Sequence, residues 1–347
     1  MSNNILKYSD RIKLKRLDLA SEIPLPGPLS VHIEPTNVCN FKCTFCPESF
    51  SNYETKAGGL FRLDLEKFKI IVKELKTLTK LKQLNFFMMG EPLVNKNISE
   101  FIKIANENDL SDWYMLSTNG TLLTEEKFQN LCESGLHYLR VSIFGSNQDI
   151  HQKITQSKIK LEKVRNNLKN FQNFKAKNNF KGPLTMAKLI DTGDKKQNEE
   201  FYNYFKGCAD EVIVEPLTNW NDPVEGNLSQ KDSNDLLNTE HYKKKKEVCP
   251  YVFYSMVIHS DLKVSICCVD WEKKTLIGDL NKQNIKDIWF GKNMHEIQLL
   301  HIQRRRGEID GCKNCTYLYT AKDNLEELKE QDFLKKTKYI LEKAGPK

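Results

Sequence analysis

The sequence predicts an α/β protein whose core is a parallel sheet covered by helices. Apolar, β-branched or aromatic runs alternate with helical patterns from residue 29 to about residue 217. The connections between these runs are long enough for the right-handed crossovers that join parallel strands. The chain has 347 residues, 39% hydrophobic and 29% charged, and can therefore bury a sizeable core. Periodicity alone fits an open doubly wound sheet or an incomplete barrel.

Six strands are expected in this part of the chain, each a short apolar run. In order they are Leu29–Pro35, Gln83–Met89, Asp112–Thr118, Tyr138–Phe144, Pro183–Ile190 and Asp210–Leu217. Helices are expected between them because apolar residues recur on one face. The clearest faces are formed by Phe68, Ile71, Val72 and Leu75, and by Leu161, Val164, Leu168 and Phe171.

The alternation ends near residue 217, and the rest of the chain is organised differently. Residues 218–245 are polar and rich in turn-forming residues, which is typical of a linker. We therefore expect an N-terminal extension at 1–27, an α/β core at 28–225, a smaller domain at 240–325 and a helical tail at 326–347. The smaller domain holds half of the ten cysteines.

Composition narrows the classes of function. No apolar run approaches the roughly 18 residues of a membrane-spanning helix, and the start of the chain lacks an apolar segment of the signal-peptide type. We therefore expect a cytoplasmic protein without a membrane partner. The net charge of +7 permits anionic partners but does not call for nucleic acid, which we do not expect as a partner. In a reducing compartment, ten cysteines favour metal or redox chemistry over disulfides.

The strongest motif is Cys39-x3-Cys43-x2-Cys46, directly after the first expected strand. Zinc usually takes four ligands, and no fourth cysteine or histidine follows within this loop. Three thiolates can instead hold a four-iron, four-sulfur cluster and leave one iron without a protein ligand. A small molecule can coordinate to such an open iron.

A second set of cysteines comprises Cys249-x17-Cys267 and Cys312-x2-Cys315. Two pairs of thiolates at these spacings suit a structural zinc site about as well as an iron–sulfur cluster. The spacing alone therefore leaves both metals open.

The Cys39 loop resembles the signature of the radical S-adenosylmethionine (SAM) enzymes. That resemblance implies a [4Fe-4S] cluster whose open iron takes the amino and carboxylate groups of SAM, and a partial (β/α)6 barrel as the core. The aromatic residue before the third cysteine, Phe45, is expected beside the adenine. The preceding Glu34-Pro-Thr-Asn-x-Cys-Asn segment and the following Pro47 are similar to a large subset of the family.

Further motifs of the family follow at the ends of successive expected strands, where α/β proteins bind ligands. Met89-Gly90-Glu91-Pro92 is similar to the family's Gly-Gly-Glu-Pro, with Met89 in place of the first glycine. This resemblance implies that Gly90 and Glu91 receive the SAM ammonium group. It further implies that two residues, Ser117 and Asn119, lie near the methionyl part. The remaining motif residue, Ser142, is expected at the ribose.

The second cysteine set resembles the SPASM domain, or its shortened "twitch" form, of the same family. The resemblance implies an auxiliary [4Fe-4S] cluster, and Cys249, Cys267, Cys312 and Cys315 are the implied ligands. A full SPASM domain carries seven cysteines for two clusters, whereas this segment has five, so one auxiliary cluster is expected. The family often has glycine five residues before its second cysteine. Leu262 stands there, and counting from it selects Cys267 as the ligand and Cys268 as its neighbour. Because neighbouring residues of a strand point to opposite faces, we do not expect both thiols to reach the same iron.

The resemblance implies an enzyme that cleaves SAM reductively to a 5′-deoxyadenosyl radical, which abstracts a hydrogen atom from a small polar substrate. The layout looks most like the aminocyclitol dehydrogenases and related sugar-modifying members, in which the auxiliary cluster accepts an electron. An electron donor such as flavodoxin or ferredoxin is then expected. The substrate and a catalytic residue remain unidentified.

Four alternatives to a dehydrogenase stay open. One is an epimerase in which Cys208 or Cys268 donates a hydrogen atom. Another is a peptide-modifying enzyme, although such members usually carry a recognition domain before the barrel and only about 28 residues precede the first expected strand. The third is a binding protein stabilised by zinc. The fourth is an enzyme that modifies tRNA or a cofactor precursor, which a salt-dependent affinity for RNA would favour.

Overall fold

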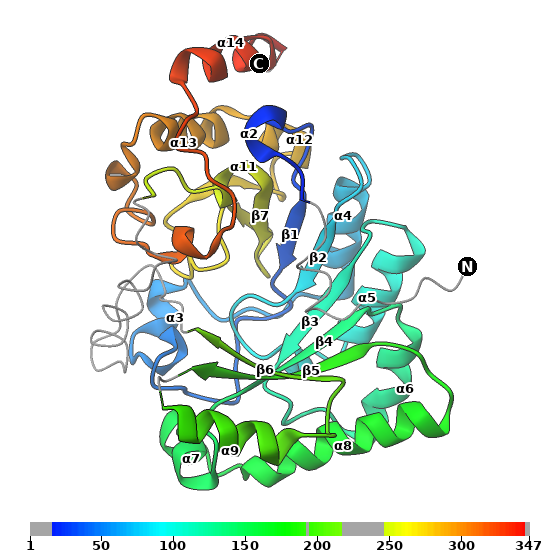
Figure 1. The fold of residues 1–347 in the computed structure, drawn as a ribbon. Coiled ribbons are helices and arrows are strands. Elements are labelled where there is room, and N and C mark those ends of the chain that lie inside the picture. The colour runs from blue at the N-terminus through cyan, green and yellow to red at the C-terminus, as the bar shows by residue number, and fades with distance from the viewer. Residues whose placement is uncertain (1–15, 192–193, 217–245, 344–347) are drawn as a thin grey trace.

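The computed structural model describes residues 16–191, 194–216 and 246–343. Its centre is a nine-stranded sheet with the order β6-β5-β4-β3-β2-β1-β7-β8-β9 (Figure 1). The first six strands run parallel: β1 Ser30–Ile33, β2 Gln83–Phe86, β3 Tyr114–Thr118, β4 Tyr138–Ile143, β5 Leu184–Asp191 and β6 Glu211–Pro216. All six expected strands are present, most of them a few residues shorter than predicted. Because β1 pairs with β7 and not with β6, the six strands form an incomplete barrel.

Helices connect successive strands and cover the outer face of this barrel (Figure 1). They are α4 Leu65–Leu75, α5 Ile98–Glu107, α6 Glu125–Glu133, α7 Gln148–Thr155, α8 Leu161–Lys177 and α9 Lys195–Phe205. Both predicted apolar helix faces are buried, one on α4 and the other on α8. Side chains stabilise several helix starts. For example, Asp64 accepts a hydrogen bond from the Lys67 amide at 2.8 Å.

Inside the barrel, a second and smaller apolar cluster fills the end where the strands begin. Trp113, Met115, Tyr138 and Met186 form it, separately from the main core under the helices. Further along β1 and β4, half-buried residues alternate with buried ones. Since alternate residues of a strand point to opposite faces, the barrel interior near the ends of these strands is accessible.

The auxiliary part of the chain continues the barrel sheet. Strand β7 (Ser255–Ile258) pairs parallel with β1, and β8 (Lys263–Ser265) and β9 (Leu276–Asp279) follow antiparallel. The helices of this part are α11 Tyr251–Tyr254, α12 Ile285–Trp289 and α13 Lys292–Ile302. The predicted linker at 218–245 lies outside the described residues.

Both ends of the described chain pack on this auxiliary part. The Trp289 indole donates to the carbonyl of Leu25, which follows the short helix α2 (Leu19–Glu22). Helix α14 (Glu330–Lys343) buries Phe333 beside the His295 ring, with ring centroids 5.3 Å apart. Residues 16–27 therefore adjoin the auxiliary part and do not stand apart from it. The remaining short helices are η1 Pro47–Ser49, α3 Tyr53–Lys56, η2 Pro92–Val94, η3 Arg306–Glu308 and η4 Tyr317–Thr320.

Candidate active site

The loop with the first three cysteines begins just after β1, at the open end of the barrel. Its backbone is fixed from the side by α7, since the Lys42 amide donates to Thr155 O at 3.1 Å and the Thr44 amide to Ile154 O at 2.9 Å. A tight turn joins the Cys46 amide to the Cys43 carbonyl at 2.8 Å. The three thiols consequently lie close enough to influence one another's ionisation.

The chemistry of these thiols fits a metal cluster. Burial raises the pKa of the Cys43 and Cys46 thiols, and it raises that of Cys39 to about 12. The nearby cation Lys42 pairs with the buried Glu48 at 3.0 Å. Three thiolates here therefore need positive charge that the surrounding protein does not supply, and cluster iron supplies it.

No three histidine, cysteine or acidic side chains within the described ranges are arranged to hold one metal ion directly. In a cluster each thiolate binds a different iron, so its cysteines need not converge on one point.

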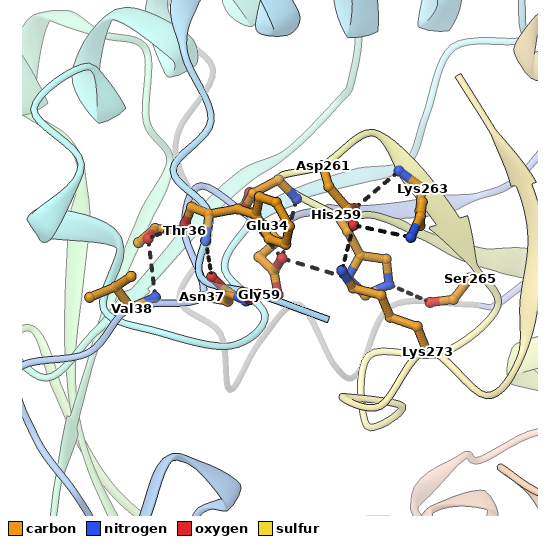
Figure 2. Close-up of polar contacts among 12 residues, drawn as sticks. Glu34, Thr36, Asn37, Val38, Gly59, His259, Asp261, Lys263, Ser265 and Lys273 are labelled. Carbon is orange, nitrogen blue, oxygen red and sulfur yellow. Dashed lines mark hydrogen bonds and ion pairs between the residues drawn. The ribbon is translucent and has the colours of Figure 1, made fainter. Parts of the chain in front are cut away.

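The residues before the cysteines shape this loop (Figure 2). Thr36 Oγ1 donates to Phe61 O at 2.8 Å, while the Asn37 side chain donates to Gly59 O at 2.8 Å and accepts from the Phe61 amide at 2.6 Å. Both side chains therefore tie the start of the loop to residues 59–61. The Glu34-Pro-Thr-Asn segment acts as a structural support in this region.

Gly90 is required where the motif after β2 meets the cysteine loop. Its φ is +73°, and a Cβ atom there would lie 2.4 Å from the carbonyl oxygen of Thr36. The adjacent Glu91 amide donates to Val38 O at 3.0 Å. Only glycine allows this close backbone contact.

The Glu91 carboxylate is buried and accepts three hydrogen bonds. Their donors are the Leu93 amide at 2.9 Å, the Thr118 hydroxyl at 2.6 Å and the Asn119 amide at 2.6 Å. Burial raises the pKa of Glu91. The carboxylate thus connects the segment after β2 to the end of β3 through hydrogen bonds.

The other predicted SAM-binding residues lie on the cysteine loop, at the end of β3 and on β4. The Asn119 side chain donates to Asn40 at 2.7 Å, which links the end of β3 to the cysteine loop. The Phe45 ring packs against Phe144 with centroids 5.0 Å apart. Ser142 lies half-buried on β4.

Arg140 is a site residue that the sequence analysis missed. Its Nε donates to Ser117 Oγ at 3.1 Å, and its guanidinium lies 4.8 Å from the centre of the Phe87 ring. Among the residues that the structure describes, it forms no ion pair with a carboxylate. The available signal was its position two residues before Ser142, which places both on the inner face of β4.

The second cysteine set also comes together. The Cys315 thiol lies close enough to raise the pKa of Cys249, Cys267 and Cys312. Burial raises the pKa of Cys249, Cys312 and Cys315, and a hydrogen bond with Cys268 together with burial raises that of Cys267. Arg306 stabilises the last turn by donating to the Cys312 and Cys315 carbonyls. Four closely spaced and largely buried thiols, with Arg306 as the cation beside them, again fit an iron–sulfur cluster.

Two expectations about single cysteines need correction. Cys267 and Cys268 follow β8 in a turn, and their thiols contact each other, so the alternation of a strand does not separate them. Cys208 is 1% exposed within the apolar core, where no substrate can reach it. Cys268, by contrast, hydrogen-bonds to the Tyr317 hydroxyl at 3.6 Å and lies within electrostatic range of Arg140.

Comparisons with known proteins agree with this arrangement. The model of the radical SAM superfamily matches residues 33–188, and that of the SPASM iron–sulfur cluster-binding domain matches residues 249–316. The chain is 24% identical to the S-adenosyl-L-methionine-dependent 2-deoxy-scyllo-inosamine dehydrogenase of Niallia circulans over 82% of this chain and 91% of that protein.

Two solved structures share the fold. BtrN in complex with AdoMet and 2-DOIA has a TM-score of 0.53 at 19% identity, covering 87% of this chain and 96% of that one. SuiB of Streptococcus suis bound to S-adenosylmethionine has a TM-score of 0.61 at 14% identity, covering 88% and 77%.

Family matches, fold and cysteine geometry lead to one conclusion about cofactors. Each matched region contains one of the two cysteine sets, and within each set the thiols lie close together. The cofactors are SAM, a SAM-binding [4Fe-4S] cluster and an auxiliary [4Fe-4S] cluster. The chain therefore belongs to the radical SAM superfamily and is an oxidoreductase with a SPASM-type auxiliary domain.

Proposed function

We propose that this enzyme is a dehydrogenase that oxidises a hydroxyl-bearing carbon of a small aminocyclitol-like substrate. The observation that carries the proposal is the group of polar side chains Ser117, Arg140 and Ser142 on β3 and β4. Asn119 joins the end of β3 to the Cys39 loop, and the Arg140 charge acts on Cys268 beside the auxiliary cysteines. A relative that matches over 91% of its own length is named as a 2-deoxy-scyllo-inosamine dehydrogenase.

In this proposal, Cys39, Cys43 and Cys46 hold the SAM-binding cluster, and Cys249, Cys267, Cys312 and Cys315 hold the auxiliary cluster. When bound, the first cluster supplies the electron that cleaves SAM, and the second provides an acceptor for the electron removed from the substrate. The first cluster is reduced by a cytoplasmic donor such as flavodoxin or ferredoxin. No helix among the described residues is both long and apolar enough to cross a bilayer.

The protein's own residues bind and orient SAM. Gly90 presents the strand edge to the ammonium group, and Glu91 keeps that edge in place through its three hydrogen bonds. Ser117 and Arg140 receive the carboxylate, since the unpaired guanidinium is the complementary cation there. The Asn119 side chain holds the end of β3 to the cysteine loop through its hydrogen bond to Asn40.

The remaining contacts involve the nucleoside. Ser142 binds the ribose from β4, and Phe45 packs against the adenine. The half-buried position of both residues leaves part of each side chain available to a ligand.

The test is turnover of the reconstituted holoenzyme with SAM, a reductant and 2-deoxy-scyllo-inosamine under anaerobic conditions. We expect one 5′-deoxyadenosine for each oxidised ring. SAM cleavage that leaves the ring unchanged, and that no other aminocyclitol stimulates, would contradict the proposed substrate class.

An epimerase is the second candidate, because the Cys268 thiol lies within electrostatic range of Arg140 on the inner face of β4. A product isomeric with the substrate, carrying one non-exchanging solvent deuterium in heavy water, would establish it. Loss of that deuterium in Cys268→Ala would identify the donor. Oxidation of the substrate without deuterium incorporation would support the dehydrogenase over the epimerase.

A further inference from the structure

The barrel interior contains an ion pair that takes no part in the proposed binding of SAM. Lys188 of β5 and Glu215 of β6 lie with Nζ and Oε2 3.1 Å apart. Lys188 is two residues beyond Met186, and Glu215 is two beyond Ile213; both reference residues belong to the apolar cluster inside the barrel. The alternation of a strand therefore directs the pair into the interior, not towards the helices.

The pair retains unused hydrogen-bonding capacity. A lysine ammonium has three donors, and a carboxylate has about four acceptor sites. Within 16–191, 194–216 and 246–343, Lys188 and Glu215 have only each other as a polar side-chain partner. Their side chains are 15% and 28% exposed, so the free donors and acceptors are available to a molecule inside the barrel.

The sheet register places this pair beside the proposed ribose position. Lys188 is the cross-strand neighbour of Ser142, and neighbouring strands lie about 4.8 Å apart. If Ser142 binds the SAM ribose, a group held by Lys188 lies next to the 5′ carbon, from which the abstracting radical derives. The pair thus occupies the position that a substrate needs.

The local charge indicates which substrates fit. Arg140 is close enough that its charge, after burial, lowers the pKa of Lys188. Under the proposed function Arg140 is neutralised by the carboxylate of SAM. The remaining pair of Lys188 and Glu215 carries no net charge, so a phosphorylated or carboxylated substrate would meet no unpaired cation there.

We propose that Lys188 and Glu215 bind neighbouring hydroxyl and amino groups of an uncharged or cationic polyol. Glu215 accepts hydrogen bonds from a substrate ammonium or hydroxyl group, and Lys188 donates to the adjacent hydroxyl oxygen. The proposal rests on the proposed function for the location of SAM. It adds the residues that select the substrate.

A purely structural ion pair is the competing explanation. Replacing a partly buried ion pair by apolar residues is often neutral or stabilising for a fold. The double variant Lys188→Met/Glu215→Leu should therefore unfold no earlier than the wild type while losing substrate binding. Loss of binding without loss of stability separates recognition from folding.

The experiment measures binding calorimetrically in the SAM-loaded holoenzyme without reductant, so that no turnover occurs. The probes are 2-deoxy-scyllo-inosamine, scyllo-inositol and glucose 6-phosphate. Wild type should bind the aminated ring most tightly and the phosphate most weakly. Glu215→Gln should weaken the binding of 2-deoxy-scyllo-inosamine at least tenfold, and more than the binding of scyllo-inositol. Lys188→Met should weaken the binding of both rings. The matched controls Lys163→Met and Glu199→Gln, at exposed helix positions, should bind like wild type.

Wild-type preference for the phosphate, no binding of any probe, or unchanged affinities in both single variants would overturn the inference. SAM cleavage driven by dithionite is measured in parallel. Its absence in wild type would refute the proposed function itself. Its persistence in the Lys188 and Glu215 variants, together with lost ring binding, supports the inference separately.

Discussion

Glu34 carries a buried carboxylate that links the barrel to the auxiliary domain (Figure 2). Its removal should lower the thermal stability of both parts. It is 2% exposed, and its Oε2 accepts from the Ser260 amide and hydroxyl, each at 3.2 Å. The same oxygen lies 3.6 Å from Nδ1 of His259. The Ser260 hydroxyl also donates to the Glu34 carbonyl at 2.8 Å. One acidic side chain thus connects the end of β1 to the turn after β7.

The expected effect follows from these contacts. Removing one partner of a buried ionic network costs about 3–5 kcal/mol. Glu34→Ala should lower the melting temperature by roughly 6–20 °C, at about 2–4 °C per kcal/mol for domains somewhat smaller than this chain. Glu34→Gln keeps the shape and one acceptor, so it should cost only about 1.5–3 kcal/mol, the value of a hydrogen bond to a charged group.

The pH dependence provides an independent check. Burial alone would raise the pKa of Glu34, but His259, Ser260 and Lys273 outweigh it and lower the pKa below its usual 4.5. The stabilisation by the carboxylate is therefore complete above that value and is lost as the pH falls through the folded-state pKa. The stability difference between wild type and Glu34→Gln should be constant near neutral pH and shrink below about pH 4.5.

The measurement is thermal unfolding of the holoenzyme, followed anaerobically by circular dichroism. Ser260→Ala and the double variant complete a cycle that isolates the coupling between the two side chains. Glu66→Gln is the control, because that carboxylate is 81% exposed and its ion pair within the described part of the chain is with Lys69. If Glu34→Ala melts within a degree of this control, or the coupling is zero, the assigned role is wrong.

Three further predictions concern the cofactor loops. Cys43→Ala should fold but make no 5′-deoxyadenosine, because two thiolates cannot hold a cluster with one open iron; undiminished product would refute the ligand assignment. Wild type should bind about eight irons per chain, Cys267→Ala about four and Cys268→Ala nearly all eight. Loss of iron in Cys268→Ala but not in Cys267→Ala would make Cys268 the cluster ligand instead. Gly90→Ala places a Cβ 2.4 Å from Thr36 O and adds about 1–2 kcal/mol of left-handed strain, so SAM affinity should fall more than tenfold; normal SAM binding would show that the backbone contact is dispensable.

Local patterns were sufficient to predict the strands and helices of the barrel, whereas the choice of a barrel over an open sheet came from the resemblance to the radical SAM family. The apolar faces of α4 and α8 and the six strand runs are signals within single segments, and all of them formed as expected. The pairing of β1 with β7 was not predictable in this way. It joins residues 30–33 to residues 255–258, and neither segment contains a pattern that specifies the other.

The site was predictable as a set of motifs but not as a set of contacts. The sequence placed Glu91 near SAM, whereas its three protein donors depend on how the ends of β2 and β3 meet. Arg140 belongs to no motif, and its role emerges only when β3 and β4 align it with Ser117. Leu262 shows the limit of pattern matching, because it adopts the left-handed φ of +67° in the turn where the family often has glycine.

The departure at Met89 has a physical explanation in the contact between the two cofactor loops. Met89 is buried in a cluster with Tyr53, which follows the first cysteines, and with Trp271, which follows Cys268. The rings of Tyr53 and Trp271 stack with centroids 5.6 Å apart. A glycine at position 89 would remove the side chain that contributes to this contact, since only a large apolar residue fills such a space. Met89 thus joins the loop that follows the first cysteines to the loop that follows Cys268, a contact that glycine could not make.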